Sequence, residues 1–243
     1  MGERPASAMV LGAGLGLRMR PHTLTIPKPL VNLGGRPMID HVLDRLADAR
    51  IATAVVNVHY RAEALITHLA QRQQPNILIS DERDLLLDTG GGVARALPLL
   101  GPGAFLIHNS DSVWSEQGKP NLERLIEAWD GERMDSLLLL APCATSLGYA
   151  GNGDFALLAD GTIRRRGRAE ATPFVFTGVS IAHPRLFEGA AVEPFSLNRL
   201  WDKSIARGRV FGKPFEGTWM HVGDPASLLQ AEAAMSGRAN VGR

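Results

Sequence analysis

An arginine and a lysine follow a glycine-rich segment near the N-terminus. Arg18 comes two residues after the last of three alternating glycines, and Lys28 stands between Pro27 and Pro29. Glycines let backbone N–H groups approach phosphate oxygens, while an arginine offers a planar fork of donors and a lysine a point charge. The two prolines are expected to hold the backbone extended around Lys28, so that a stiff segment presents this side chain. These residues therefore predict a polyphosphate site with Arg18 and Lys28 as its catalytic cations.

Two common phosphate-binding motifs do not fit this spacing. A dinucleotide-binding G-x-G-x-x-G segment that starts at Gly12 would need a third glycine where the chain has Leu17. A P-loop places its lysine directly after the last glycine, but no lysine occurs before Lys28. A tight turn between a strand and a helix would also use glycines, yet it does not account for Arg18 and Lys28.

Residues 14–29 resemble the N-terminal signature of the sugar-1-phosphate nucleotidyltransferases, which runs roughly G-x-G-x-R-M/L-x-P-L-T-x-x-x-P-K-P. His22 and Thr23 are slightly displaced from its Leu-Thr pair, and the resemblance weakens after about residue 140. It implies an enzyme that joins an NTP to a sugar 1-phosphate and releases pyrophosphate. The phosphate-binding arginine and lysine of the family correspond to Arg18 and Lys28. The nucleotide-binding positions that the resemblance implies in the glycine loop are Leu11, Gly12, Ala13, Gly14 and Gly16.

The resemblance gives roles to two further polar segments. Residues 87–92 contain three consecutive glycines and are expected to form a turn that binds the base, although the first turn of a helix would use them equally. Asp111 follows an apolar strand and is expected to hold Mg²⁺, with Mn²⁺ as a possible substitute, unless it is a simple turn residue. The remaining nucleotide-binding positions expected in these segments are Asp88, Thr89, Gly90 and Asn109.

One late position departs from the family pattern. Many relatives carry a W-x-D-x-G-T segment whose aspartate is a second metal ligand, but this chain has His221 two residues after Trp219. Imidazole is a poor ligand for Mg²⁺ and a good one for softer metals. Three explanations stay open: Asp111 and the phosphates suffice, Asp224 substitutes, or the metal preference has changed. Asp224 precedes a proline, so an ordinary helix cap is its plainer interpretation.

The sugar is expected to bind in the second half of the chain. The Glu-Lys pair that some relatives use on the sugar phosphate is missing. Arginines at positions 164, 165, 166 and 168 occupy that region, and a solvated charge run explains them more simply. The sugar-binding residues that the resemblance implies are Gly153, Asp154 and Gly178.

Within the family, residues 88–92, 153–155 and 176–180 resemble most the members that transfer uridylyl to N-acetylmuramate 1-phosphate in bacterial cell-wall recycling. Guanylyl transfer to mannose 1-phosphate is the alternative. A regulator that binds a nucleotide-sugar without turnover is a third hypothesis, which only His221 favours. No hexapeptide repeat follows, which excludes the bifunctional acetyltransferase members.

Alternating strands and helices must position these residues. The strands expected in the first half are 8–11, 54–58, 77–79 and 105–107, and the helices between them are 37–48, 63–71 and 92–99. Three βα units predict a parallel sheet covered on both faces. In the second half we expect helices at 122–129, 197–206 and 227–234, strands at 137–140 and 174–181, and a hairpin around residues 160–161.

These elements indicate an α/β protein with a Rossmann-like three-layer α/β/α fold and a mixed, mostly parallel central sheet. Residues 1–243 are expected to form a single domain, with a nucleotide-binding half at about 8–115 and a sugar-phosphate-binding half at about 116–235. In such sheets, ligands bind outside the carboxyl ends of the strands. The glycine loop and the segment around Asp111 would both lie there.

Composition excludes several classes of partner. The 26 basic residues nearly balance the 25 acidic ones, which argues against nucleic acid or an anionic membrane as a partner. The longest apolar stretch, around 137–141, is too short to span a bilayer. A single cysteine and the lack of a signal-peptide core predict a cytoplasmic protein. The oligomeric state stays open.

Overall fold

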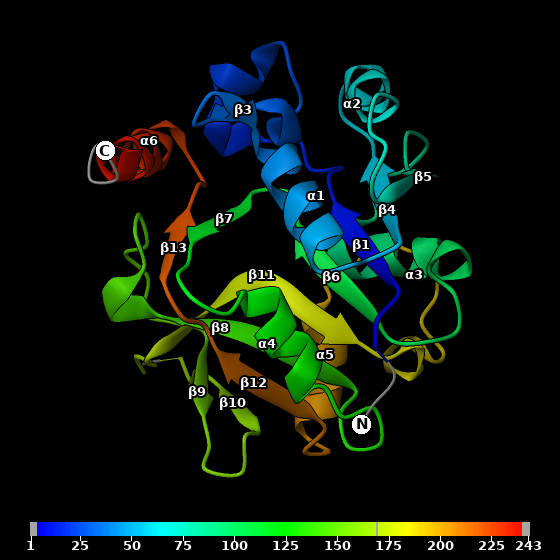
Figure 1. Ribbon diagram of the computed structural model, residues 1–243. Coiled ribbons are helices and arrows are strands. Elements are labelled where there is room, and N and C mark those ends of the chain that lie inside the picture. The colour runs from blue at the N-terminus through cyan, green and yellow to red at the C-terminus, as the bar shows by residue number, and fades with distance from the viewer. Residues whose placement is uncertain (1–3, 169, 240–243) are drawn as a thin grey trace.

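The computed structural model describes residues 4–168 and 170–239, and its centre is a twisted nine-stranded sheet (Figure 1). The strands of this sheet are β1 (Ser7–Leu11), β4 (Thr53–Val58), β5 (Asn76–Asp81), β6 (Phe105–Asn109), β8 (Ser136–Pro142), β9 (Phe155–Leu157), β10 (Ile163–Arg165), β11 (Phe174–Ala182) and β12 (Val210–Pro214). Two small sheets pair β2 (Asn32–Leu33) with β3 (Arg36–Pro37) and β7 (Ser112–Ser115) with β13 (Thr218–His221). The α-helices are α1 (Met38–Asp48), α2 (Ala62–Leu69), α3 (Asp88–Leu100), α4 (Asn121–Ala128), α5 (Asn198–Ile205) and α6 (Pro225–Ala239).

The N-terminal half is built from parallel strands in the order β6-β1-β4-β5, connected through α1, α2 and α3. Alternate residues of β1 face opposite sides, because side chains alternate along a strand. Ala8 and Val10 pack with α1, α2 and α4 in one core, and Met9 packs with α3 and α5 in another. The sheet is therefore covered by helices on both faces, which confirms the predicted three-layer α/β/α fold.

Strand β11 joins the two halves, because it runs antiparallel to β6 on one side and to β8 on the other. Its register shifts between Phe176 and Ser180, and Gly178 within this bulge has a φ of +85°. The predicted hairpin is present as β9 and β10, which pair antiparallel, and β12 pairs parallel to β8. The central sheet is thus mixed, as predicted, and it continues through both halves of the chain.

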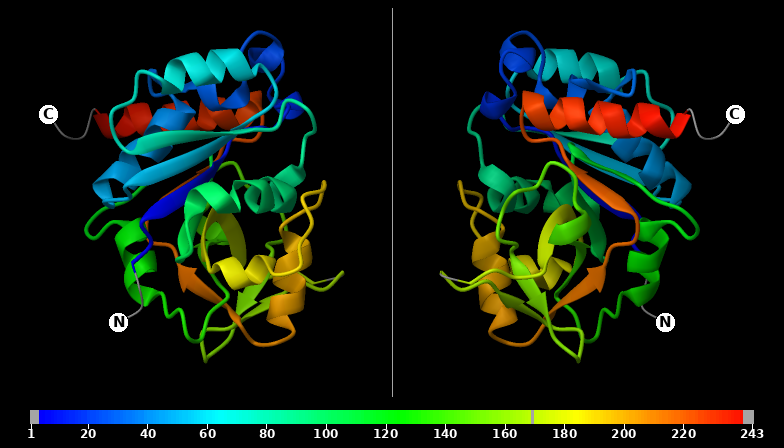
Figure 2. Two further views of the ribbon diagram at one scale, coloured as in Figure 1. Left: turned by 90° about the vertical axis from the view of Figure 1, so that its right-hand side faces the viewer. Right: turned by 90° about the vertical axis from the view of Figure 1, so that its left-hand side faces the viewer.

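The chain's last helix returns to the N-terminal half. Figure 2 shows α6, in red, beside the blue segments that follow β1. Leu228 and Ala231 of this helix share a buried core with Met19 and Val31. The backbone N–H of Gly34 also donates to a carboxylate oxygen of Glu232 on α6, at 2.9 Å. The segment that carries Arg18 and Lys28 therefore rests on the C-terminal helix.

One predicted helix begins earlier than expected. The helix predicted at 92–99 starts at Asp88, so the expected base-binding turn is the first turn of α3. A Cβ on Gly90 would lie 2.2 Å from the ring of Phe195. The glycines of this turn are thus required by close packing inside the molecule. No helix in the described part of the chain has the length and apolar character needed to cross a membrane.

Candidate active site

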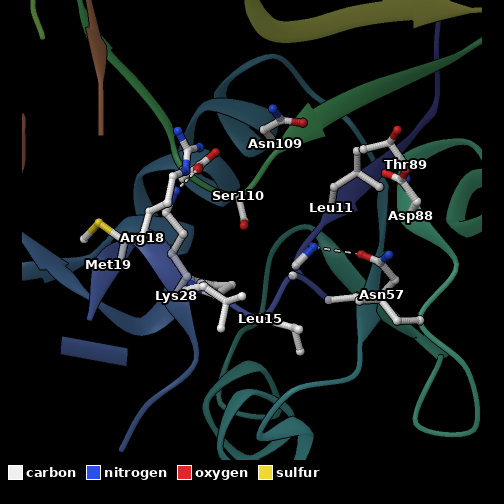
Figure 3. A pocket seen from close by; sticks show the side chains of 18 of the residues that line it. Leu11, Leu15, Arg18, Met19, Lys28, Asn57, Asp88, Thr89, Asn109 and Ser110 are labelled. Atoms are coloured by element: carbon white, nitrogen blue, oxygen red, sulfur yellow. Dashed lines mark hydrogen bonds and ion pairs between the residues drawn. The ribbon is translucent and has the colours of Figure 1, made fainter. Parts of the chain in front are cut away.

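A pocket of about 710 Å³ lies at the carboxyl ends of β1 and β6, where the topology of an open α/β sheet predicts a ligand. Figure 3 shows Arg18 and Lys28 on one side of it and Asp88 and Thr89 on the other. Its lining comprises Leu11, Gly12, Ala13, Gly14, Leu15, Gly16, Leu17, Arg18, Met19, Lys28, Pro29, Asn57, Glu82, Leu86, Asp88, Thr89, Asn109, Ser110, Asp111 and Gly223.

The glycine loop after β1 lines this pocket and carries backbone donors without a protein acceptor. The N–H of Gly12 donates to the side chain of Asn57, but among the described residues no protein acceptor meets the N–H groups of residues 13–16. A Cβ on Gly14 would meet nothing within 4 Å, whereas one on Gly16, at φ +63°, would lie 2.9 Å from Thr23. Gly16 therefore shapes the loop, and Gly14 leaves the pocket open above it. A run of free N–H groups is a site for an anion.

Two short 3₁₀ helices present the cations. Arg18 lies in Leu17–Met19, where the buried side chain of Met19 anchors the turn and Arg18 itself is exposed. Lys28 begins the 3₁₀ helix Lys28–Leu30. The extended backbone predicted around Lys28 is therefore wrong beyond Pro27, because Pro29 is accommodated in the helical turn itself. The lysine is still presented by a stiff segment.

Lys28 forms an ion pair with Asp111, and their side chains are only 15% and 28% exposed. Burial would raise the pKa of Asp111, but the charge and hydrogen bond of Lys28, with a smaller effect of His221, hold that pKa below its usual value. Asp111 is consequently ionised at neutral pH. The structure brings Arg18, Lys28 and Asp111 together in the lining of one pocket, and their catalytic and metal-binding roles stay predictions.

His221 reaches the neighbourhood of Asp111 because β13 pairs with β7, which places His221 opposite Ser112. Its ring packs against Tyr149 and Trp219, with centroids 6.2 and 5.7 Å away. Burial lowers the pKa of His221, against the raising effect of Asp111. The imidazole is therefore neutral at pH 7, and it stands beside the pocket lining.

Asp224 caps α6 instead of facing the pocket. The N–H of Ser227 donates to a carboxylate oxygen of Asp224 at 2.8 Å, and the Ser227 hydroxyl accepts from the Asp224 N–H at 3.0 Å. These contacts are those of a helix cap, which is the plainer interpretation of Asp224. Among the described residues, no group of three or more His, Cys, Asp or Glu side chains could hold a metal ion by itself.

At the other end of the pocket, Asp88 has a positive φ of 59° and accepts a hydrogen bond from the N–H of Thr89 at 2.6 Å. The Thr89 hydroxyl accepts from the N–H of Leu197 at 2.9 Å. Asp88, Thr89 and Asn109 all line the pocket, as expected of nucleotide-binding residues. Gly90 lies outside the lining, because it packs against Phe195.

The three expected sugar-binding residues also lie outside the pocket lining. Asp154 accepts a hydrogen bond from the N–H of Phe176 at 2.9 Å, and the N–H of Gly153 donates to the Tyr149 hydroxyl at 3.1 Å. Gly178 makes room for Asn109, whose Nδ2 would lie 2.7 Å from a Cβ at that position. These contacts lie within the fold, and a sugar-binding role for the three residues stays a prediction.

The arginines at positions 164–166, in the second half of the chain, all have partners. Arg164 pairs with Glu170 and Arg165 with Asp202, while Arg166 donates to the carbonyl oxygen of Gly153. Their partners agree with the interpretation as a surface charge run.

Sequence reasoning missed Asn57 and Glu82, which line the pocket although both side chains are buried. Asn57 belongs to β4 and Glu82 follows β5, next to the carboxyl ends of two predicted strands. A polar residue at that end of a parallel strand was the available signal. Ser110 and Gly223 also line the pocket, although sequence reasoning assigned neither of them a role of its own.

Known proteins resemble the whole chain. Residues 7–146 match the family described as Nucleotidyl transferase. The N-acetylmuramate alpha-1-phosphate uridylyltransferase of Caulobacter vibrioides is 48% identical over 97% of this chain and 99% of its own length. The protein of the same description from Neisseria meningitidis serogroup B is 33% identical over 93% of this chain and 96% of its own.

Among solved structures, the inositol-1-phosphate CTP transferase from T. maritima has a TM-score of 0.75 at 17% identity, over 93% of both chains. This likeness concerns the fold. The family match covers more than half of the chain, and the two relatives are similar along nearly their entire length. The chain therefore belongs to the nucleotidyl transferase family.

Proposed function

We propose that the protein transfers a uridylyl group from UTP to N-acetylmuramate 1-phosphate and releases pyrophosphate. The observation that carries this proposal is the pocket in which unpaired N–H groups of the glycine loop lie together with Arg18, Lys28 and Asp111. These are the groups that a triphosphate requires. The base and the sugar are proposed from the two relatives, both of which are named N-acetylmuramate alpha-1-phosphate uridylyltransferases.

The proposed reaction is an in-line attack of a sugar-phosphate oxygen on the α-phosphorus of UTP. The P–O bond to the β-phosphate breaks, and pyrophosphate leaves with the electron pair. A phosphate monoester has a second pKa of about 6, so the nucleophile is already ionised at neutral pH and needs no general base. The protein must align two polyanions and reduce their repulsion. Arg18 and Lys28 supply the positive charge for this role.

A divalent cation serves the family in general. Asp111 suits such an ion, because its carboxylate is ionised and lines the pocket. A single carboxylate fits Mg²⁺, which commonly takes one or two protein carboxylates and completes its shell with phosphates and water. When bound, Mg²⁺ supplies charge that offsets the repulsion between the phosphates. We propose Mg²⁺ at Asp111, with Mn²⁺ as a possible substitute.

The division of the chain into a nucleotide-binding half and a sugar-phosphate-binding half remains part of the proposal. All lining residues except Gly223 fall between positions 11 and 111, which supports the first half as the nucleotide site. The continuous sheet across β11 supports a single domain. The sugar would enter from the side of Tyr149 and His221, where the second half approaches Asp111.

The test is a screen of the four NTPs against a panel of sugar 1-phosphates, read by pyrophosphate release with Mg²⁺. UTP with N-acetylmuramate 1-phosphate is expected to give the highest kcat/KM. Preferred turnover of GTP with mannose 1-phosphate would replace the proposal with the guanylyl alternative, which has less support because both relatives above are uridylyltransferases. Nucleotide binding without pyrophosphate release from any pair would favour a regulator.

A further inference from the structure

A buried pair of side chains connects the two walls of the pocket. Asn57 is 3% exposed and Glu82 is 0% exposed. The backbone N–H of Gly12 donates to Asn57 Oδ1 at 2.7 Å, a bond drawn in Figure 3. Asn57 Nδ2 then donates to Glu82 Oε1 at 2.7 Å, and the N–H of Leu87 donates to Glu82 Oε2 at 3.1 Å. Three hydrogen bonds thus link the start of the glycine loop to the residue before α3.

In this series of hydrogen bonds, the donors and acceptors can be arranged in only one way. Because Asn57 must present its oxygen to the Gly12 N–H, it presents its NH₂ group to Glu82. Leu87 also directs a donor at Glu82. Position 82 must therefore accept two hydrogen bonds with two oxygens, which a carboxylate does and a glutamine cannot. This requirement explains a buried carboxylate that, within the described residues, forms no ion pair.

The third glycine of the triplet makes room for the pair. A Cβ on Gly92 would lie 2.8 Å from Glu82 Oε1 and 2.9 Å from Asn57 Nδ2. His59 adds a contact between its Nδ1 and the carbonyl oxygen of Glu82 at 2.7 Å. The packing of α3 against β4 and β5 is therefore shaped around these two side chains.

We propose that Asn57 and Glu82 form a brace that sets the distance between the phosphate end and the nucleoside end of the pocket. The brace acts on the ligand through backbone: it holds Gly12, and with it the free N–H groups of residues 13–16, against the start of α3 at Asp88. Both are positioning residues. Their expected effect on turnover rests on the proposed function, because misplacing reacting groups by about 1 Å can cost about a hundredfold in rate.

Two isosteric substitutions and their combination test the brace. In Asn57→Asp, a carboxylate oxygen of the new aspartate faces Glu82 Oε1, so two acceptors meet. In Glu82→Gln, the NH₂ group of the new glutamine faces either Asn57 Nδ2 or the Leu87 N–H, so two donors meet. The double variant restores the pattern, since the new glutamine donates to the new aspartate and still accepts from the Leu87 N–H. Each single variant should lower kcat/KM for the NTP by about tenfold to a hundredfold. The double variant should return to within about threefold of the wild type, as coupled neighbours do.

Hydrogen exchange without substrate gives a second readout, independent of activity. Peptides covering residues 11–16 and 84–90 should exchange faster in each single variant and return to wild-type protection in the double variant. The matched control is Glu63→Gln on the surface, where the carboxylate is 78% exposed and neither readout should change.

Three results would overturn the brace. The first is no rescue in the double variant, whether or not the single variants fold. The second is single variants that melt at lower temperature but keep wild-type kinetics per folded molecule. The third is unchanged exchange in both peptides. If the wild type itself releases no pyrophosphate with any substrate pair, the proposed function fails. The hydrogen-exchange pattern still shows whether Asn57 and Glu82 form the brace.

Discussion

Lys28 is the residue on which the phosphate site depends most directly, since it lies in the pocket and pairs with Asp111. Lys28→Ala should lower kcat/KM by at least about a hundredfold, because a charge contact to the transition state is worth about 3 kcal/mol. The melting temperature should change little. Steady-state pyrophosphate release measures the effect, with Lys119→Ala on the surface as the control. Near-normal turnover in Lys28→Ala would remove its catalytic role.

Asp111 is ionised by the influence of Lys28, and it has the charge that a divalent cation needs. Asp111→Asn keeps the shape of the side chain and removes that charge. The Mg²⁺ concentration for half-maximal activity should therefore rise by at least about tenfold in a folded protein. The measurement is a Mg²⁺ titration of pyrophosphate release. A titration curve identical to the wild type would show that Asp111 is no metal ligand.

The family resemblance leads one to expect a second acidic ligand at position 221, but the chain has His221, whose ring packs against Tyr149 and Trp219. We expect that Asp111 and the phosphates hold Mg²⁺ without it, since one protein carboxylate suffices in many phosphate sites. His221→Asp should then give no strong gain of activity with Mg²⁺. The variant is assayed with Mg²⁺ and Mn²⁺ in parallel. A large gain with Mg²⁺ alone would instead make His221 a direct ligand.

At the scale of elements, the side chain of Asp135 connects three segments of the second half through hydrogen bonds. Its side chain is 6% exposed and accepts from Arg185 Nε at 2.6 Å, Ser204 Oγ at 2.7 Å and Arg209 Nε at 2.8 Å. Asp135 precedes β8, while its partners belong to the 3₁₀ helix Pro184–Phe187, to α5 and to the segment before β12. Asp135→Asn should reduce the free energy of unfolding by about 2 kcal/mol.

The same residue predicts a pH dependence. Burial would raise the pKa of Asp135, but the hydrogen bonds from Arg185, Arg209 and Ser204 lower it overall. A carboxyl with a depressed folded-state pKa stabilises fully above its unfolded pKa of about 3.9, and this contribution is lost as the pH falls through the folded value. Thermal unfolding of the wild type and Asp135→Asn should thus differ at pH 7 and converge below about pH 4. A difference that stays constant down to pH 3 would contradict this account, and Glu127→Gln serves as an exposed control.

At the scale of the molecule, the C-terminal helix supports a site formed almost entirely by the first 111 residues. Leu228, 6% exposed, packs in the core that contains Met19 and Val31, while the neighbouring Leu229 is 71% exposed. Leu228→Ala should cost about 2–4 kcal/mol of stability and raise KM for the NTP, because the segment bearing Arg18 and Lys28 loses its support. Leu229→Ala is the matched control and should leave both unchanged. Equal melting temperatures and equal KM values for the two variants would show that α6 does not support the site.

Residues close in sequence were predicted well. The strands of the N-terminal half and the helices α1 and α2 follow from hydrophobic periodicity, which acts over a few residues. The glycine loop, Arg18 and Lys28 follow from a short motif, and their place in one pocket with Asp111 follows from the rule that parallel strands end at a common edge. Local pattern also predicted the hairpin of β9 and β10.

Only the tertiary structure decided which side chains the glycines accommodate and which distant strands meet. Gly90 leaves room for the ring of Phe195, and Gly92 leaves room for the side chain of Glu82. The spacing of these residues along the sequence could not predict the contacts. The short strands β7 and β13, too brief for a periodic signal, place His221 near Asp111. The Asn57–Glu82 pair exists because β4 and β5 end side by side against α3, and its polar atoms must satisfy one another once water is excluded.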